Sequence, residues 1–274
     1  TWNGSSWTEV ADLNTAKTNF WTSRGSTTVM LVYGPPTNES FNGSSWTEIA
    51  EPNTNRIQLM GGGADNTSAL AFGGYTPAPA ASATTESYNG SSWTELNDLN
   101  LARGNGAGLG TVTSALCFSG YNATTSPDYP TETEEWNGSS WTEIADMSTA
   151  RQTLNGQGTS TLALASGGQA PGGFQTATEE LSMNAPVGAW STGTALNSAR
   201  SESMGSGSSS EAALVFGGGS PSTITESWDG SSWTEVNDLN TGRGGAGSST
   251  GAYTSVIVFG GEPVTANAET WNGS

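Results

Sequence analysis

The stretch TESYNGSSWTEL, residues 85–96, contains a phrase that the chain repeats, and this repetition decides the fold. Near copies of NGSSWTE place tryptophans at regular intervals, at Trp7, Trp46, Trp93, Trp141, Trp190 and Trp233. The intervals are 39, 47, 48, 49 and 43 residues, and Trp2 and Trp271 stand in equivalent positions 269 residues apart. Six repeats of about 45 residues each are typical of a β-propeller, in which every repeat supplies one four-stranded blade.

Each repeat divides into four segments that we expect to be short strands. The two segments around NGSS form an antiparallel hairpin, because Asn and Gly tolerate the positive φ of a tight turn. A Gly-rich segment follows, as in GNGAGLGT (104–111), and suits the propeller axis, where backbones crowd together. The last segment is apolar throughout, as in SALAFGG (68–74), so neighbouring blades must cover both of its faces.

Six apolar segments predict six blades, in an all-β domain that spans residues 1–274. We place the repeats at 5–43, 44–90, 91–138, 139–184, 185–230 and 231–274. Residues 244–271 hold only three strands of the last blade. We therefore expect residues 5–10 to supply its fourth strand, which closes the ring and leaves no exposed edge there. The chain begins inside a repeat and without Met, which suggests an excerpt from a longer protein.

Two repeats carry a set of marks that resembles the kelch repeat, namely a Gly-Gly pair, an aromatic residue, a Trp and an Arg. Here the marks are Gly73-Gly74, Tyr88, Trp93 and Arg103, and again Gly217-Gly218, Trp228, Trp233 and Arg243. The pattern departs from the kelch form at Gly34-Pro35, Ser119-Gly120, Leu181 and NAPVGAWST (184–192). The resemblance covers the whole chain and implies a kelch propeller.

The composition excludes several functions. There are 25 acidic and 7 basic residues, a formal net charge of −18, so nucleic acid and anionic membranes should repel the chain. No apolar stretch reaches 18 residues, which argues against membrane insertion. The sequence has no His, which removes the nucleophile systems that depend on it and the usual ligands for copper and zinc. We therefore expect no metal site and no cofactor, and a buried thiol at the lone Cys117.

Carboxylates are numerous, but they recur at equivalent positions, and a group present in every blade is better explained by structure than by catalysis. One set precedes the turn, at Glu39, Glu86, Glu134, Glu179, Glu226 and Glu269. A glycosidase needs one convergent carboxylate pair, and the Asp-box turn of sialidases is matched only in part by SWDGSSW (227–233). We expect no catalytic residues and no enzyme activity. A carboxylate-based, glycan-active enzyme is the least favoured alternative.

Six of the seven basic residues fall one per blade, just before the innermost strand, at Lys17, Arg56, Arg103, Arg151, Arg200 and Arg243. Two interpretations stay open. A cationic ring at the channel mouth would capture anions, whereas pairing with the six repeated Glu residues would fasten blade to blade. Arg suits bidentate contact with a carboxylate, and the equal numbers favour pairing.

The copies differ most in the connection after the apolar strand, where nine of the eleven prolines fall. By strand alternation, these connections and the Arg-bearing ones emerge on one face, and the NGSS turns on the other. Variable loops over a rigid scaffold often carry binding residues. The three longest loops contain aromatic residues that are able to stack on a sugar ring or a protein partner, at Tyr75, Tyr121, Tyr129 and Phe174. The alternative is that these aromatics only cover the loop bases.

The repeats also resemble the Gly- and Ser-rich kelch-like arrays of marine bacteriophage virions and tail fibres, in which near-verbatim NGSSWTE copies are common. That resemblance implies a virion or extracellular location. We expect a non-enzymatic binding or structural module that presents its variable loops to a host-surface glycan or protein. The alternative is a purely architectural virion or decoration domain that contacts only other virion subunits.

Overall fold

Antiparallel β-sheet makes up the regular structure of the protein. The computed structural model describes residues 11–16, 22–25, 29–33, 37–78, 80–124, 128–183, 189–219, 221–248, 252–263 and 267–271, the side chains of 22–25 and 33 excepted. These residues form 25 strands and no helix. Within them, accordingly, nothing has the form of a membrane-spanning helix.

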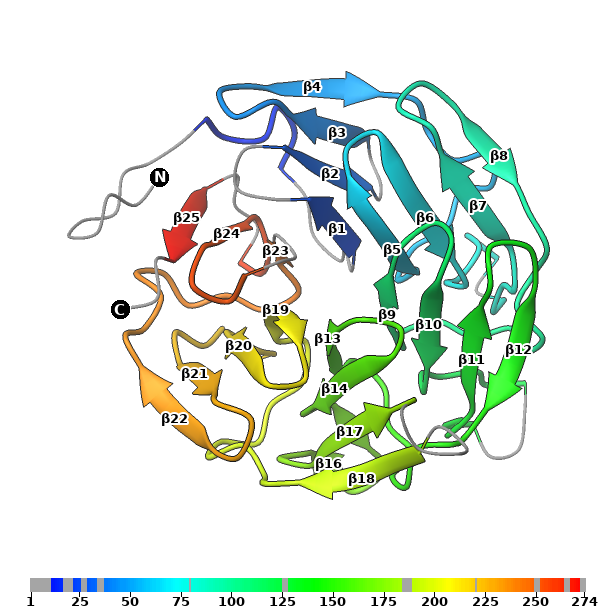
Figure 1. The fold of residues 1–274 in the computed structure, drawn as a ribbon. Helices are drawn as coiled ribbons and strands as arrows, with labels where there is room; N and C mark the ends of the chain where they lie inside the picture. The colour runs from blue at the N-terminus through cyan, green and yellow to red at the C-terminus, as the bar shows by residue number, and fades with distance from the viewer. Residues whose placement is uncertain are drawn as a thin grey trace.

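Six sheets stand as blades around a common centre (Figure 1). Blade 1 is β1 (Thr22–Gly25), β2 (Met30–Tyr33), β3 (Asn38–Phe41) and β4 (Trp46–Ile49). Blade 2 is β5 (Met60–Asp65), β6 (Ser68–Phe72), β7 (Thr85–Tyr88) and β8 (Trp93–Glu95). Blade 3 is β9 (Ala107–Gly110), β10 (Ala115–Phe118), β11 (Thr133–Trp136) and β12 (Trp141–Ile144).

Blade 4 is β13 (Asn155–Gly158), β14 (Leu162–Ser166), β17 (Thr178–Ser182) and β18 (Ala189–Gly193). A separate small hairpin, β15 (Gln169–Ala170) with β16 (Gly173–Phe174), rises from the connection between β14 and β17. Blade 5 is β19 (Met204–Ser209), β20 (Ala212–Phe216), β21 (Thr225–Trp228) and β22 (Trp233–Val236). Blade 6 has three described strands, β23 (Gly247–Ser248), β24 (Val256–Phe259) and β25 (Ala268–Trp271).

The four sequence segments take the places predicted for them. The Gly-rich segment is the inner strand in blades 2 to 6, whereas the inner strand of blade 1 is TSRG, and the apolar segment is the second strand of every blade. The segments before and after the repeated turn are the third and fourth strands, and the fourth is described in blades 1 to 5. Figure 1 shows the inner strands β1, β5, β9, β13, β19 and β23 nearest the centre. The prediction of a six-bladed, all-β propeller is confirmed. Because the sequence repeats begin at the turn, each combines the outer strand of one blade with the first strands of the next.

The NGSS turn is held by the Asn side chain rather than by an unusual Asn backbone. Asn42 Oδ1 accepts the backbone N–H groups of Ser44 and Ser45 at 3.0 and 2.9 Å, an Asx-type turn. The positive φ of the turn belongs to Gly43, at 94°, and Asn42 is not among the positive-φ residues. The predicted hairpin is therefore confirmed, but the expected role of the Asn backbone is wrong. In each complete copy the aromatic residue before the turn lies directly opposite the Trp, as Tyr88 does opposite Trp93.

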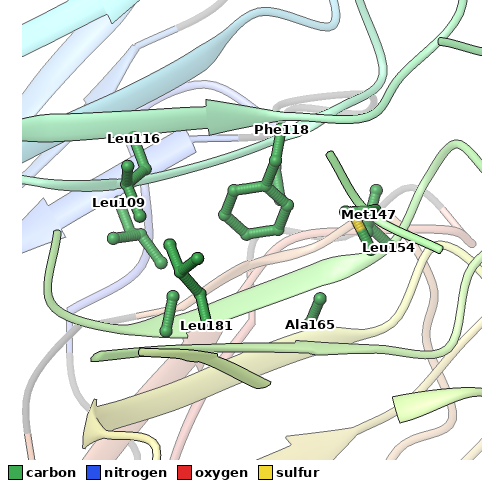
Figure 2. Packing of buried hydrophobic residues seen from close by; sticks show 9 residues of the cluster. Leu109, Leu116, Phe118, Met147, Leu154, Ala165 and Leu181 are labelled. Carbon is green, nitrogen blue, oxygen red and sulfur yellow. The ribbon is translucent and has the colours of Figure 1, made fainter. Parts of the chain in front are cut away.

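Apolar side chains of the second strands fill the spaces between blades. All four residues of β10 are buried, because one blade covers each face of the strand. Figure 2 shows Leu116 and Phe118 of blade 3 facing Leu181 and Ala165 of blade 4. The repeated Trp also crosses between blades: the Trp141 indole N–H of blade 3 donates to Thr85 Oγ1 of blade 2 at 3.0 Å.

Blades 6 and 1 pack together, so the six blades form a closed ring. Trp46 of blade 1 contacts Phe259 of blade 6 with ring centroids 5.3 Å apart. Met30 and Val32 share a buried cluster with Ile257 and Phe259, and the inner strands β1 and β23 are in contact. The strand predicted at residues 5–10 lies outside the described residues, so its pairing with β25 stays a prediction.

One departure from the Gly-Gly pattern has a clear structural basis. Gly73 has a φ of 65°, and an added Cβ would lie 2.4 Å from the Arg103 carbonyl oxygen, so only glycine fits there. Ser119 occupies the equivalent position in blade 3 with a φ of 58°. Its hydroxyl donates to the Arg151 carbonyl, which compensates for a backbone conformation that a non-glycine residue rarely adopts.

Candidate functional site

Five of the six repeated basic residues are buried, and each is paired with one repeated Glu. The Nη2–Oε1 distances are 2.8 Å for Arg56–Glu86, 2.9 Å for Arg103–Glu134 and 3.1 Å for Arg151–Glu179, and Arg200–Glu226 and Arg243–Glu269 make the same contact. The five Arg side chains are 0–5% exposed. The sixth basic residue, Lys17, lies outside the described residues.

Each pair fixes the connection that enters a blade onto the third strand of that blade. Arg103 Nη1 donates to the Glu132 carbonyl at 2.9 Å while its Nη2 reaches Glu134. The Glu134 carboxylate also accepts the Asn100 N–H at 2.7 Å and the Leu101 N–H at 3.2 Å. Burial lowers the pKa of Arg151 to about 10, and Glu179 opposes that shift. The buried guanidinium groups are therefore engaged inside the blades and do not line an exposed channel mouth.

A repeated Asn completes this network, and sequence reasoning did not single it out. Three residues before each basic residue stands Asn14, Asn53, Asn100, Ser148, Asn197 or Asn240. The backbone N–H of each donates to the repeated Glu at 2.7–2.8 Å. The signal was present in the sequence, because this Asn keeps a constant spacing to the basic residue in five of the six copies.

The variable connections and the Arg-bearing connections meet on one face of the propeller, which we call the loop face. The backbones of Tyr75 and Ile57 exchange two hydrogen bonds of 2.9 Å, and Gly104 pairs with Tyr121 in the same way. The opposite face, the hairpin face, carries the NGSS turns and the turns between inner and second strands. There Gly90 of one turn lies against Thr67 of the other.

Three of the predicted loop-face aromatics form a chain across blades 2 and 3. The Tyr75 hydroxyl donates to the Tyr121 carbonyl at 2.6 Å, and its ring lies so close to Gly104 that a Cβ there would be 2.4 Å from a ring carbon. Burial raises the pKa of Tyr75. Tyr121 and Tyr129 pack edge to face with centroids 5.3 Å apart. All three tyrosines are half-buried, and the Tyr75 hydroxyl is in addition engaged by a hydrogen bond within the protein.

Phe174 and Ile57 are the large apolar side chains most open to solvent among the described residues. Phe174 is 48% exposed on the β15–β16 hairpin, and Ile57 is 40% exposed beside Tyr75. Sequence reasoning missed Ile57. A comparison of the copies would have found it, because the position after the basic residue holds Thr18, Gly104, Gln152, Ser201 and Gly244 in the other five copies.

A belt of backbone hydrogen bonds links the blades where the Arg-bearing connections enter the inner strands. Its members are Gln58, Asn105, Thr153, Glu202 and Gly245, with φ values of 54°, 57°, 51°, 51° and 55°. Each later member donates its N–H to the carbonyl of the member before it, at 3.1, 2.6, 3.1 and 2.9 Å. Left-handed backbone at residues other than glycine costs about 1–3 kcal/mol per residue unless the surroundings enforce it, and here neighbouring blades supply that constraint.

No group of three or more Cys, Asp or Glu side chains among the described residues is arranged to hold a metal ion. Burial raises the pKa of Glu202, a member of the belt, and Glu262 adds to that shift. Burial also raises the pKa of the Cys117 thiol to about 11, which disfavours the reactive thiolate.

Comparison with known proteins adds support for the fold. No protein-family model matches the chain, and no curated protein matches it. Among the solved structures, that of YjhT matches with a TM-score of 0.73 and 14% sequence identity, over 94% of this chain and 94% of that chain. Identity this low shows a shared fold alone, and it supports the six-bladed propeller.

Proposed function

We propose that this propeller is a non-enzymatic binding module whose loop face contacts a host-surface glycan or protein. The observation that carries the proposal is that repeated and variable positions differ in their contacts. The repeated Arg, Glu and Asn side chains make buried contacts within the blades. The exposed apolar side chains Phe174 and Ile57, and the half-buried Tyr121–Tyr129 pair, stand where the copies differ.

The chemistry of this face suits a neutral ligand. Aromatic and apolar side chains offer flat contact area to a sugar ring or to an apolar protein patch. The net charge of −18 repels polyanions, so an acidic polysaccharide or a nucleic acid is disfavoured. A glycan and a protein partner both remain within the proposal.

We further propose that the chain is kelch-like and serves on a virion, such as a phage tail fibre, or on another extracellular surface. The contacts give the Gly-Gly mark a reason to recur: the Gly74 N–H donates to the backbone carbonyl of Arg103 at 2.9 Å, and Gly73 leaves room for that carbonyl. The glycines of one blade thereby hold the backbone that enters the next blade, and the Arg mark recurs for a separate reason, its pairing with Glu134. The virion location rests on the near-verbatim repeats of NGSSWTE.

The test compares two variants on a printed array of bacterial surface polysaccharides. The loop-face variant carries Tyr121→Ala, Tyr129→Ala and Phe174→Ala, and keeps Tyr75 because its hydroxyl is bonded internally. The control carries Ser44→Ala, Ser91→Ala and Ser139→Ala on the hairpin face, where these residues are exposed. We expect the control to keep the binding of the unmodified chain and the loop-face variant to lose it. Equal binding by both variants would contradict the proposal. No binding of the unmodified chain to the array would remove the glycan from the proposal and leave a protein partner or a purely architectural role.

A further inference from the structure

The central channel contains a cavity at its hairpin-face end. Its volume is about 380 Å³, and four inner strands, β5, β9, β13 and β19, contribute to its wall. This lies near the lower end of the range of about 300–1,000 Å³ that is usual for small-molecule sites. One water molecule occupies about 30 Å³ in the liquid, so the space is far larger than a single ordered water needs.

The described wall of this cavity carries no charged side chain and combines apolar carbon surface with hydroxyl, amide and backbone polar groups. Seven glycines line it and bring the backbone itself to the surface of the cavity, which allows a ligand to approach closely. Hydroxyl groups come from the turns and strand ends, at Thr111, Ser114, Thr159, Ser160, Ser206 and Ser208. No Asp, Glu, Lys or Arg is among the described residues of the wall.

Gln157 is the side chain that points to a ligand. It is 3% exposed in the middle of β13, it lines the cavity, and neither its Oε1 nor its Nε2 has a hydrogen-bond partner among the described protein atoms. The amide reaches across to β19, where a Cβ added to Gly205 would lie 1.9 Å from Nε2. Burial of an amide without hydrogen bonds costs free energy, so a buried Gln beside a cavity calls for a partner inside it.

We propose that this cavity binds an uncharged, hydroxyl-rich molecule of about the size of one monosaccharide. The Gln157 amide offers one acceptor and donors to a pair of neighbouring hydroxyl groups, and the Ser and Thr hydroxyls both donate and accept. A charged ligand would lose its hydration without gaining a counter-charge from the described wall. The described part of the wall has no aromatic residue for stacking, so we expect a modest affinity, with Kd of about 1 mM.

This site is independent of the loop face. Its wall includes Ala64, Thr111 and Ser160, which belong to the turns between inner and second strands on the opposite side of the propeller. Loss of loop-face binding would leave it intact, and the reverse also holds. A free sugar and the terminal sugar of a longer glycan share the required chemistry.

The test measures saturation-transfer NMR and calorimetric binding of glucose, galactose, mannose and sorbitol, with gluconate and glucosamine as charged counterparts of similar size. The variant Gln157→Met keeps the length of the side chain and removes both amide atoms. Gln169→Met, on β15 at the loop face, is the matched control. Methyl glycosides and the corresponding trisaccharides, measured in parallel, distinguish a free sugar from a glycan end.

We expect at least one neutral compound to bind the unmodified chain and Gln169→Met equally, and Gln157→Met to bind it about tenfold more weakly, as expected for two lost hydrogen bonds. The melting temperature of Gln157→Met should stay equal or rise, which shows that the loss is not a folding failure. Absence of binding by every neutral compound overturns the proposal. Equal binding by Gln157→Met, or binding of the charged compounds as tight as that of the neutral ones, overturns it as well.

Discussion

Replacing Arg103 by Met should reveal how much the buried ion pairs contribute to the blades. Arg103 and Glu134 are 0% and 1% exposed, so the substitution leaves a carboxylate without its counter-charge inside the protein. Removal of one partner of a buried pair costs about 3–5 kcal/mol. The Asn100 and Leu101 N–H groups still donate to Glu134, and the Glu132 carbonyl still accepts the Ser119 N–H. We therefore expect the lower end, a loss of about 3 kcal/mol.

The assay is guanidinium chloride unfolding followed by tryptophan fluorescence, with the slope of the transition compared between proteins. The matched control is Glu143→Gln, which removes one charge from an exposed residue directly opposite Glu134. That change should alter the free energy of unfolding by less than about 0.5 kcal/mol. A loss below about 1 kcal/mol for Arg103→Met, the value for a solvent-exposed pair, would refute the conclusion that these pairs are desolvated parts of the framework.

Single contacts lead to three further predictions. The pKa of Asp229 is lowered from its ordinary 3.8 to about 2 by hydrogen bonds from Ser231 and Ser232. The stability that the ionised Asp229 contributes is thus present above about pH 4 and is lost as the pH falls towards 2. In Asp229→Asn, the melting temperature should therefore depend less on pH between about 4 and 2. If both proteins show the same acid dependence, this reasoning is wrong. Cys117, fully buried with its pKa raised to about 11, should resist a thiol reagent at pH 8 in the folded protein and react after unfolding. Stoichiometric labelling of the native protein would contradict its burial. Deletion of residues 1–10 should lower the melting temperature. In three blades the repeated Trp donates its indole N–H to a Thr of the preceding blade, in the pairs Trp141–Thr85, Trp190–Thr133 and Trp233–Thr178. We predict the same bond from Trp7 to Thr225, and the deletion removes it. An unchanged melting temperature would argue against the closing strand.

The sequence predicted the structure correctly wherever the same packing or pairing requirement applies to every copy of the repeat. Strand order and blade number follow from the apolar second segment, since only a strand covered on both faces reads as apolar throughout. The register of the hairpins follows from the aromatic and Trp on either side of NGSS, which lie opposite each other in β7 and β8. The equal numbers of repeated basic and Glu residues already favoured pairing between them.

The rest depended on contacts between blades that no local pattern encodes. Gln58, Thr153 and Glu202 adopt left-handed backbone because neighbouring blades hold them there, against the preference of these residue types. The sequence alone does not tell whether Asn42 stabilises the turn by a positive φ or by accepting a hydrogen bond with its side chain, and the structure shows the second. Tyr75 is an aromatic residue in a variable loop, as a binding residue would be. Only the hydrogen bond from its hydroxyl to the Tyr121 carbonyl shows that it holds the neighbouring loop. Gln157 did leave a signal, as the one long polar side chain within the Gly-rich segment LNGQGTS (154–160).

The central claim is that the residues repeated in every blade build the ring, and that the residues differing between blades bind the host-surface ligand. Hydroxyl-radical footprinting by mass spectrometry, with and without a polysaccharide that is positive on the array, tests it most directly. The account predicts protection of Tyr121, Tyr129 and Phe174 on the loop face, with oxidation unchanged at the exposed NGSS turns. Protection at those turns, with the loop-face aromatics oxidised as before, would contradict it.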